Sequence, residues 1–248
     1  MTIWGKLLGG AAGFALGGPL GALLGAVAGH AVDRLADQPA AAPTEIDERA
    51  ATRQIAFTIG IIVLGAKMAK ADGAVSRSEV AAFKQVFTVP PEQEANVGRI
   101  FDQARRDAHG FEPYAAQIAR LFRRKSPVLE ELLDGLFHIA KADGTVGEEE
   151  MAYLRRVAQI FGFEEADFAR IREGHLGPDA GDPYNILGVS RDMDNAAIKS
   201  AYRRLVRDSH PDRLIAKGMP AEAIAIANQR LAVINGAYDR IRKERGIA

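Results

Sequence analysis

The sequence contains no cysteine, and this absence excludes disulfide bonds, zinc sites with thiolate ligands and cysteine nucleophiles. Net charge is also absent, because 32 basic side chains balance 32 acidic ones. A neutral chain without a large basic patch interleaved with aromatic residues is not expected to bind nucleic acid. At 248 residues with 48% apolar content, the chain is long enough to form two small domains plus accessory segments.

Charged residues are missing from Leu7 to Gly29, a stretch long enough to cross a bilayer. Glycines recur at every fourth position in this stretch, so a helix would carry them on one face. Such a face lets a second helix approach closely within a membrane. We therefore expect residues 1–36 to be a glycine-rich membrane anchor containing a helix, and a possible homodimer contact formed by Gly9, Gly13, Gly17, Gly21 and Gly25.

Three other interpretations of this stretch stay open. A cleaved signal peptide would begin with a stronger basic region than Lys6 alone. A short hairpin would turn at Gly17-Gly18-Pro19, with each arm too short to span by itself. A water-facing helix is disfavoured, because each glycine costs about 1 kcal/mol relative to alanine.

Residues 37–45 contain two prolines and no apolar periodicity, which is typical of a short linker. Residues 46–173 show helical periodicity throughout. The apolar run from Ile55 to Leu64 is too short for a second membrane span. It predicts the central helix of an all-helical bundle, surrounded by neighbouring helices.

The middle region contains an internal repeat. Lys70-Ala71-Asp72-Gly73-Ala74-Val75 with Glu79 recurs as Lys141-Ala142-Asp143-Gly144-Thr145-Val146 with Glu150. This spacing matches the second half of an EF-hand loop, so Asp72, Glu79, Asp143 and Glu150 are candidate metal ligands. The first half of an EF-hand loop is missing, and a lysine occupies one ligand position in each copy. Helix capping by Ser76 with Glu79, and by Gly147 with Glu150, is the favoured interpretation.

With its two Asp-Gly turns between helices, the middle region resembles the tellurite-resistance TerB fold. The four repeated carboxylates are also the best enzyme hypothesis that the chain offers. This enzyme hypothesis is weak, because no histidine, serine or lysine stands at a spacing typical of a nucleophile or proton relay.

Residues 174–181 form a second predicted linker, and residues 182–248 then carry three helical patterns. Asp182-Pro183 is typical of a helix start. The second helix, capped by Asp192 or Asp194, has an apolar face and an opposite basic face, and the third runs from about Ala221 to Lys243. The last two helices should pair as an antiparallel hairpin. The basic face contains Lys199, Arg203, Arg204 and Arg207.

Three motifs occur here in order: Tyr184-x-x-Leu187-Gly188-Val189, then Ile198-Lys199-Ser200-Ala201-Tyr202-Arg203-Arg204-Leu205, then His210-Pro211-Asp212. Together they resemble the J-domain signature. With the opening Trp4-Gly5-Lys6, the glycine-rich segment and the TerB-like middle, nearly the whole chain is similar to the DjlA family of membrane-anchored DnaJ-like co-chaperones. Even the segment Leu214 to Pro220 is similar to that family's longer loop.

This resemblance implies a co-chaperone that stimulates a DnaK-type ATPase, and that is not itself an enzyme and needs no cofactor. It places the basic second helix against an acidic surface of the ATPase, and His210-Pro211-Asp212 at the junction of that partner's domains. Because DnaK and ATP are cytosolic, we expect the bacterial inner membrane as the location, with the soluble domains facing the cytoplasm.

Two other functions remain open at this point. The TerB-like region would act as a divalent-metal sensor if its repeated carboxylates bound an ion. Alternatively, the glycine-rich segment would be an oligomerising membrane scaffold that carries the C-terminal region as a passenger. The sequence identifies no client protein.

Overall fold

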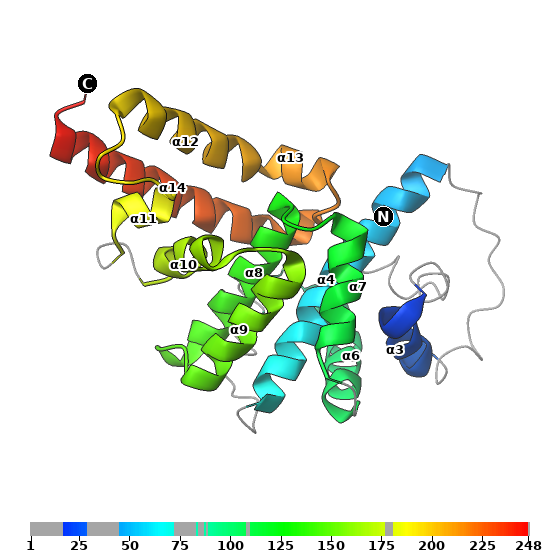
Figure 1. Ribbon diagram of the computed structural model, residues 1–248. Helices are drawn as coiled ribbons and strands as arrows, with labels where there is room; N and C mark the ends of the chain where they lie inside the picture. Colours follow the sequence, from blue (N-terminus) through cyan, green and yellow to red (C-terminus); the bar gives the residue numbers. More distant parts are fainter. Residues whose placement is uncertain are drawn as a thin grey trace.

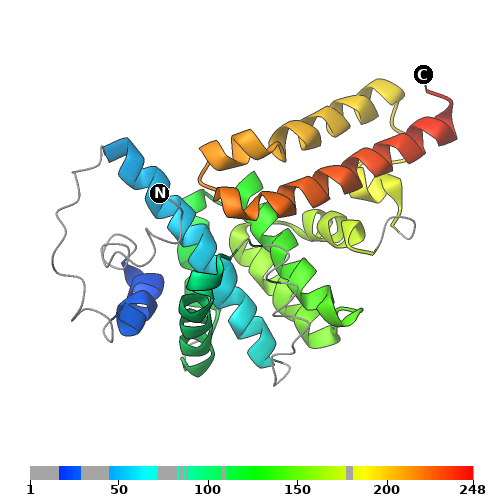
Figure 2. The same cartoon turned by 180° about the vertical axis from the view of Figure 1, so that it is seen from behind.

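A computed structural model of the chain describes residues 17–28, 45–71, 83, 87, 89–107, 110–176 and 181–247. All regular secondary structure in these ranges is helical, as the sequence predicts. We call residues 46–173 the middle domain and residues 182–248 the C-terminal domain. Figures 1 and 2 show the C-terminal domain lying across one end of the middle-domain helices.

The middle domain is a bundle built around one buried helix. Its elements are α4 (Glu45–Ala71), η2 (Pro91–Gln93), α6 (Glu94–Arg106), α7 (Glu112–Phe122), α8 (Pro127–Ala140), η3 (Lys141–Asp143), α9 (Glu148–Phe161) and α10 (Glu165–Gly174). Helix α4 contacts α6, α7, α8 and α9, and its residues 55–69 are all buried. The predicted central helix is therefore confirmed. Arg49–Ala69 also has the length and hydropathy of a membrane span, but 78% of that window is buried among its neighbours, as in a soluble core.

Helix α3 (Gly18–Ala28) begins inside the uncharged N-terminal stretch. Gly17 and Gly18 have φ values of +55° and +56°, and Gln117 of α7 accepts a hydrogen bond from the Leu20 N–H at 3.0 Å. A helix running unbroken from Leu7 to Gly29 does not agree with this start, since Pro19 and the two left-handed glycines interrupt it. The break lies at Gly17-Gly18-Pro19, where the alternative interpretation as a short hairpin places its turn. Eleven residues span about 16 Å, which is less than a bilayer core.

The predicted glycine face is only partly visible. Gly21 is buried and Gly17 is exposed, and Gly25 lies within α3, whereas Gly9 and Gly13 lie outside the described residues. Leu20, Leu23 and Leu24 of α3 are buried in the core of the middle domain. In this arrangement α3 contacts α6 and α7, so its apolar side faces protein.

The C-terminal domain contains α11 (Pro183–Leu187), α12 (Asn195–Asp208), α13 (Pro211–Ala216), η4 (Ala221–Ala223) and α14 (Ile224–Arg245). The predicted helix starts are confirmed: Asp182 accepts from the Tyr184 N–H at 2.8 Å, and Asp194, rather than Asp192, accepts from the Ala197 N–H at 2.7 Å. Helices α12 and α14 lie side by side in both views (Figures 1 and 2), and they form the expected hairpin.

The C-terminal domain divides its apolar residues between two cores. Its own core is formed by α11, α12 and the C-terminal part of α14, and includes Leu187, Ile198 and Ile241. Leu214, Met219, Ala223, Ile226 and Ala227 belong instead to the core of the middle domain. Ala227 therefore packs against the middle domain, and Leu231 is half-buried, because the start of α14 passes over α8.

Candidate functional site

The His210-Pro211-Asp212 loop begins a short helix directly after the C-terminal end of α12. His210 is the N-cap of α13, and its Nδ1 accepts a hydrogen bond from the Asp212 N–H at 3.2 Å. Pro211 occupies the first helical turn, where its fixed φ is already suited to a helix. The side chains of His210 and Asp212 are 52% and 89% exposed. The loop is therefore ordered by local bonds while its two polar side chains face solvent.

The basic face of α12 is open to solvent as well. Lys199, Arg203, Arg204 and Arg207 are all exposed. Among the described residues, the ion pair recorded for this face joins Arg207 Nε to the adjacent Asp208 Oδ1 at 3.8 Å. Exposed cations of this kind attract an acidic surface over a distance but bind only weakly one by one.

Aromatic packing fixes the orientation of α12. The rings of Tyr202 and Tyr238 stack with centroids 4.0 Å apart and planes 5° apart, and the Tyr202 hydroxyl donates to Asn235 Oδ1 at 3.1 Å. Ile198 and Leu205 of the same helix are buried in the domain's own core. Because these groups hold the apolar side of α12 against α14, the basic side points away from the protein.

Two residues that sequence reasoning missed flank the loop. Ser209, immediately before His210, is 2% exposed, and Leu214, two residues after Asp212, is fully buried. Leu214 packs in the core of the middle domain together with Met219. The sequence contained one indication that this segment is buried: it carries a leucine and a methionine, which are more often buried than exposed.

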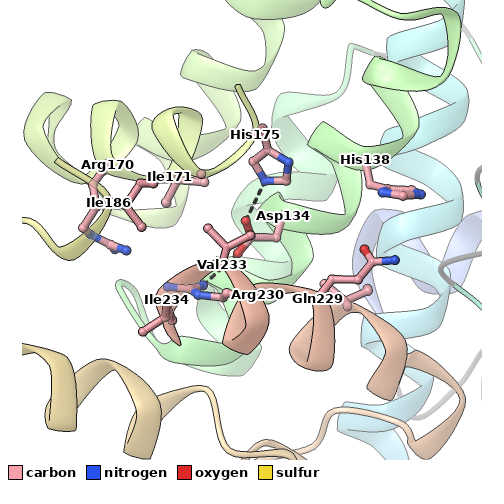
Figure 3. Close-up of a pocket in the computed structure, with 12 residues that line it drawn as sticks. Asp134, His138, Arg170, Ile171, His175, Ile186, Gln229, Arg230, Val233 and Ile234 are labelled. Carbon is pink, nitrogen blue, oxygen red and sulfur yellow. Dashed lines mark hydrogen bonds and ion pairs between the residues drawn. The ribbon is translucent and has the colours of Figure 1, made fainter. Parts of the chain in front are cut away.

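A cluster of charged side chains joins the two domains near this loop (Figure 3). Arg230 of α14 is 9% exposed, and its Nη1 donates to Asp134 Oδ2 of α8 at 2.8 Å. Its Nη2 contacts Glu130, which also pairs with Arg170 of α10. His175, in the predicted linker, lies with Nε2 2.7 Å from Asp134 Oδ1. A cavity of about 120 Å³ adjoins the cluster.

Electrostatics in this cluster differ from one carboxyl group to the next. Burial raises the pKa of Asp134, but Arg230 and the hydrogen bond from His175 hold it below its usual value. Burial dominates at Glu131, which is fully buried and has a pKa raised to about 8. Neither Glu131 oxygen has a hydrogen-bond partner among the described residues. Two groups nevertheless oppose the effect of burial on the pKa of Glu131: Arg230, whose Nη1 lies 3.5 Å from Oε1, and the Ser209 hydroxyl.

The repeated Asp-Gly turn has a capping role in its second copy. The Gly147 N–H donates to Glu150 Oε2 at 2.8 Å, which confirms the predicted capping at the start of α9. Gly144 has a φ of +109°, a conformation that favours glycine. No group of three or more potential metal ligands occurs in the described part of the chain. Asp72, Glu79 and the Ser76 cap lie outside the described residues, and Asp143 lies in η3.

Comparison with protein families divides the chain into three matched regions. Residues 1–54 match the co-chaperone DjlA transmembrane domain, residues 58–173 match tellurite resistance protein TerB, and residues 182–245 match the DnaJ domain. The anchoring segment, the helical middle and the exposed His-Pro-Asp loop together define a membrane-anchored J-domain co-chaperone.

Individual relatives extend this match along most of the chain. The co-chaperone protein DjlA of Photobacterium profundum is 30% identical over 216 residues, which cover 77% of this chain and 78% of the relative. That of Shewanella oneidensis is 31% identical over 232 residues, covering 84% and 85%. The chain belongs to the DjlA family of co-chaperones. No solved structure matches it.

Proposed function

We propose that this co-chaperone binds a DnaK-type ATPase through the basic face of α12 and the His210-Pro211-Asp212 loop, and stimulates its ATP hydrolysis at a membrane surface. The observation that carries the proposal is the loop itself. Asp212, 89% exposed, projects from a helix start held by Pro211 and by the His210 cap. A rigid, solvated carboxylate of this kind is suited to a charge-assisted hydrogen bond with a cationic group of the partner.

The two parts of the surface have different tasks. Lys199, Arg203, Arg204 and Arg207 accelerate and orient the encounter with an acidic partner, and the loop then provides specificity. The chain itself needs no cofactor and carries out no turnover, because hydrolysis takes place in the ATPase. Since that ATPase is cytosolic, the two soluble domains face the cytoplasm from the bacterial inner membrane.

The glycine-rich anchor is proposed to associate with that of a second copy in the bilayer, through the face that contains Gly9, Gly13, Gly17, Gly21 and Gly25. Replacing Gly13, Gly17 and Gly21 with leucine should reduce crosslinked dimers in membranes. Unchanged dimers would contradict this contact without affecting the proposed ATPase stimulation.

The proposed function is tested by measuring steady-state DnaK ATPase activity with the full chain reconstituted in lipid vesicles. Asp212→Asn and His210→Gln should each abolish the stimulation while leaving the circular dichroism spectrum unchanged. Asp239→Asn is the matched control, because Asp239 is 63% exposed on α14 and its ion pair, at 3.7 Å, is with Arg242 of the same helix. Normal stimulation by either loop variant would refute the assignment.

A further inference from the structure

The activating loop is held on both sides by the middle domain. Ser209 precedes the loop and is 2% exposed, beside Glu131 of α8. Leu214 follows the loop and is fully buried in the core of the middle domain. The three loop residues therefore span a short distance between two fixed points. A change in the backbone conformation of the loop would displace Ser209 or Leu214 from the interface between the domains.

The surface that holds the loop is closely packed. Ile226 of α14 lies over Gly135 of α8: a Cβ added to that glycine would be 3.1 Å from Ile226 Cδ1. Gly218 approaches α4 similarly, because a Cβ there would lie 2.5 Å from Arg53 Cβ and 3.3 Å from Phe122 Cε1. Gly218 also has a φ of +104°, so a glycine is favoured at this contact by both conformation and space.

The charged cluster restricts how the C-terminal domain can dock on the middle domain. Arg230 reaches from α14 to Asp134 at 2.8 Å and to Glu130, with 9% of its side chain exposed. If the domains separated, these side chains would be exposed to water. If the domains docked in another arrangement, the carboxylates would be buried without Arg230. Buried charged groups of this kind are weak as net stabilisers but penalise alternative arrangements.

Docking leaves the proposed partner surface uncovered. The basic residues of α12 are exposed, as are His210 and Asp212, while the residues on either side of the loop face the middle domain. The contact therefore does not block access to the loop. Its effect is to fix the position of the loop relative to the middle domain and so relative to the membrane anchor.

We propose that Arg230, acting with Asp134 and Glu130, is a positioning residue for DnaK stimulation: it docks the C-terminal domain on α8, and this docking holds the His210-Pro211-Asp212 loop in its active geometry. The inference rests on the proposed function. A loop fixed in advance loses less conformational freedom when the partner binds, and a misplaced one loses much of its effect.

The first test is Arg230→Met in the full chain in vesicles. Maximal DnaK stimulation should fall by about tenfold, while the half-saturating DnaK concentration changes less than about twofold because the basic face is intact. Arg242→Met is the matched control and should stimulate normally, because Arg242 lies on the same helix, is 42% exposed and pairs with the exposed Asp239 at 3.7 Å.

A reversible lock separates positioning from a loss of folding. A Cβ on Gly174 of α10 would lie 3.5 Å from Val233 Cγ1 of α14, within the reach of a disulfide. The chain has no cysteine of its own, so Gly174→Cys with Val233→Cys gives a single possible bond. In the Arg230→Met background, the oxidised form should recover most of the stimulation, and dithiothreitol should remove it again.

Each outcome bears on a stated claim. Stimulation by Arg230→Met equal to that of the unmodified chain would overturn the inference while the proposed function stands. An oxidised, folded lock that does not recover stimulation would also overturn it. An unmodified chain that fails to stimulate DnaK would refute the proposed function, and this inference with it.

Discussion

Arg230 Nη1 donates a hydrogen bond to Asp134 Oδ2 over 2.8 Å, across the boundary between the C-terminal and middle domains. The two residues are 96 positions apart in the sequence, and their side chains are only 9% and 12% exposed. An ion pair this well removed from water differs from the exposed pairs elsewhere on the protein, which contribute little to stability. Several measurable properties depend on it.

Removal of Arg230 should destabilise the protein strongly, because Glu130 and Asp134 lose the buried cation that they share and keep only Arg170 and His175 as partners. We expect Arg230→Met to lower the free energy of unfolding in urea by about 3 kcal/mol. Arg242→Met should change it by less than about 0.5 kcal/mol, as is usual for an exposed site. Equal effects of the two variants would show that the cluster is not a structural unit.

Glu131 should make stability depend on pH. Its pKa in the folded protein is raised from 4.5 to about 8 by burial, with Arg230, Ser209, Asp134 and Glu130 facing it. The folded state therefore keeps a proton that the unfolded state releases, so this contribution is fully present below pH 4.5 and is lost as pH rises through about 8.

Chemical denaturation between pH 5 and pH 9 measures this effect. Glu131→Gln should remove a slope of up to about 1.4 kcal/mol per pH unit. The exposed Glu149→Gln on α9 should leave the slope unchanged. If the profile of Glu131→Gln matches that of the unmodified chain, Glu131 is ionised in the folded protein.

Two glycine substitutions should have opposite effects. Gly218→Ala places a Cβ at φ +104° and against Arg53, so it should cost about 2 kcal/mol of stability. Gly236→Ala, within α14 and with nothing within 4 Å of its Cβ, should stabilise the helix by about 1 kcal/mol. Urea unfolding compares the two, and a neutral Gly218→Ala would mean that this segment is not held against α4.

The basic face of α12 should act through long-range charge. Arg203→Ala combined with Arg207→Ala should raise the half-saturating DnaK concentration several-fold at low salt, with little change in maximal stimulation. The difference should shrink as ionic strength rises to about 0.5 M, where the screening length is short. A change confined to maximal stimulation would place these arginines in the activation step rather than in the encounter.

Helix starts in both domains could be predicted because each depends on neighbouring residues. Asp182 and Asp194 cap helices with side chains two and three residues from the N–H groups they bind. The repeated Gly147 and Glu150 capping pair is equally local. The sequence does not decide the break before α3, because Pro19 and the glycine pair permit both a turn and a kinked helix, and the contact with Gln117 lies 97 residues away.

The helical class, the bundle around α4, the helical hairpin and the position of the His210-Pro211-Asp212 loop can all be predicted from the sequence, because apolar periodicity and capping residues act over a few positions. Tertiary structure alone decided that Leu214 leaves its own domain's core and that Arg230 meets Asp134. Those pairings depend on which helix faces are left uncovered once each bundle has formed. Periodicity within one helix identifies its apolar face, but not the partner that buries it.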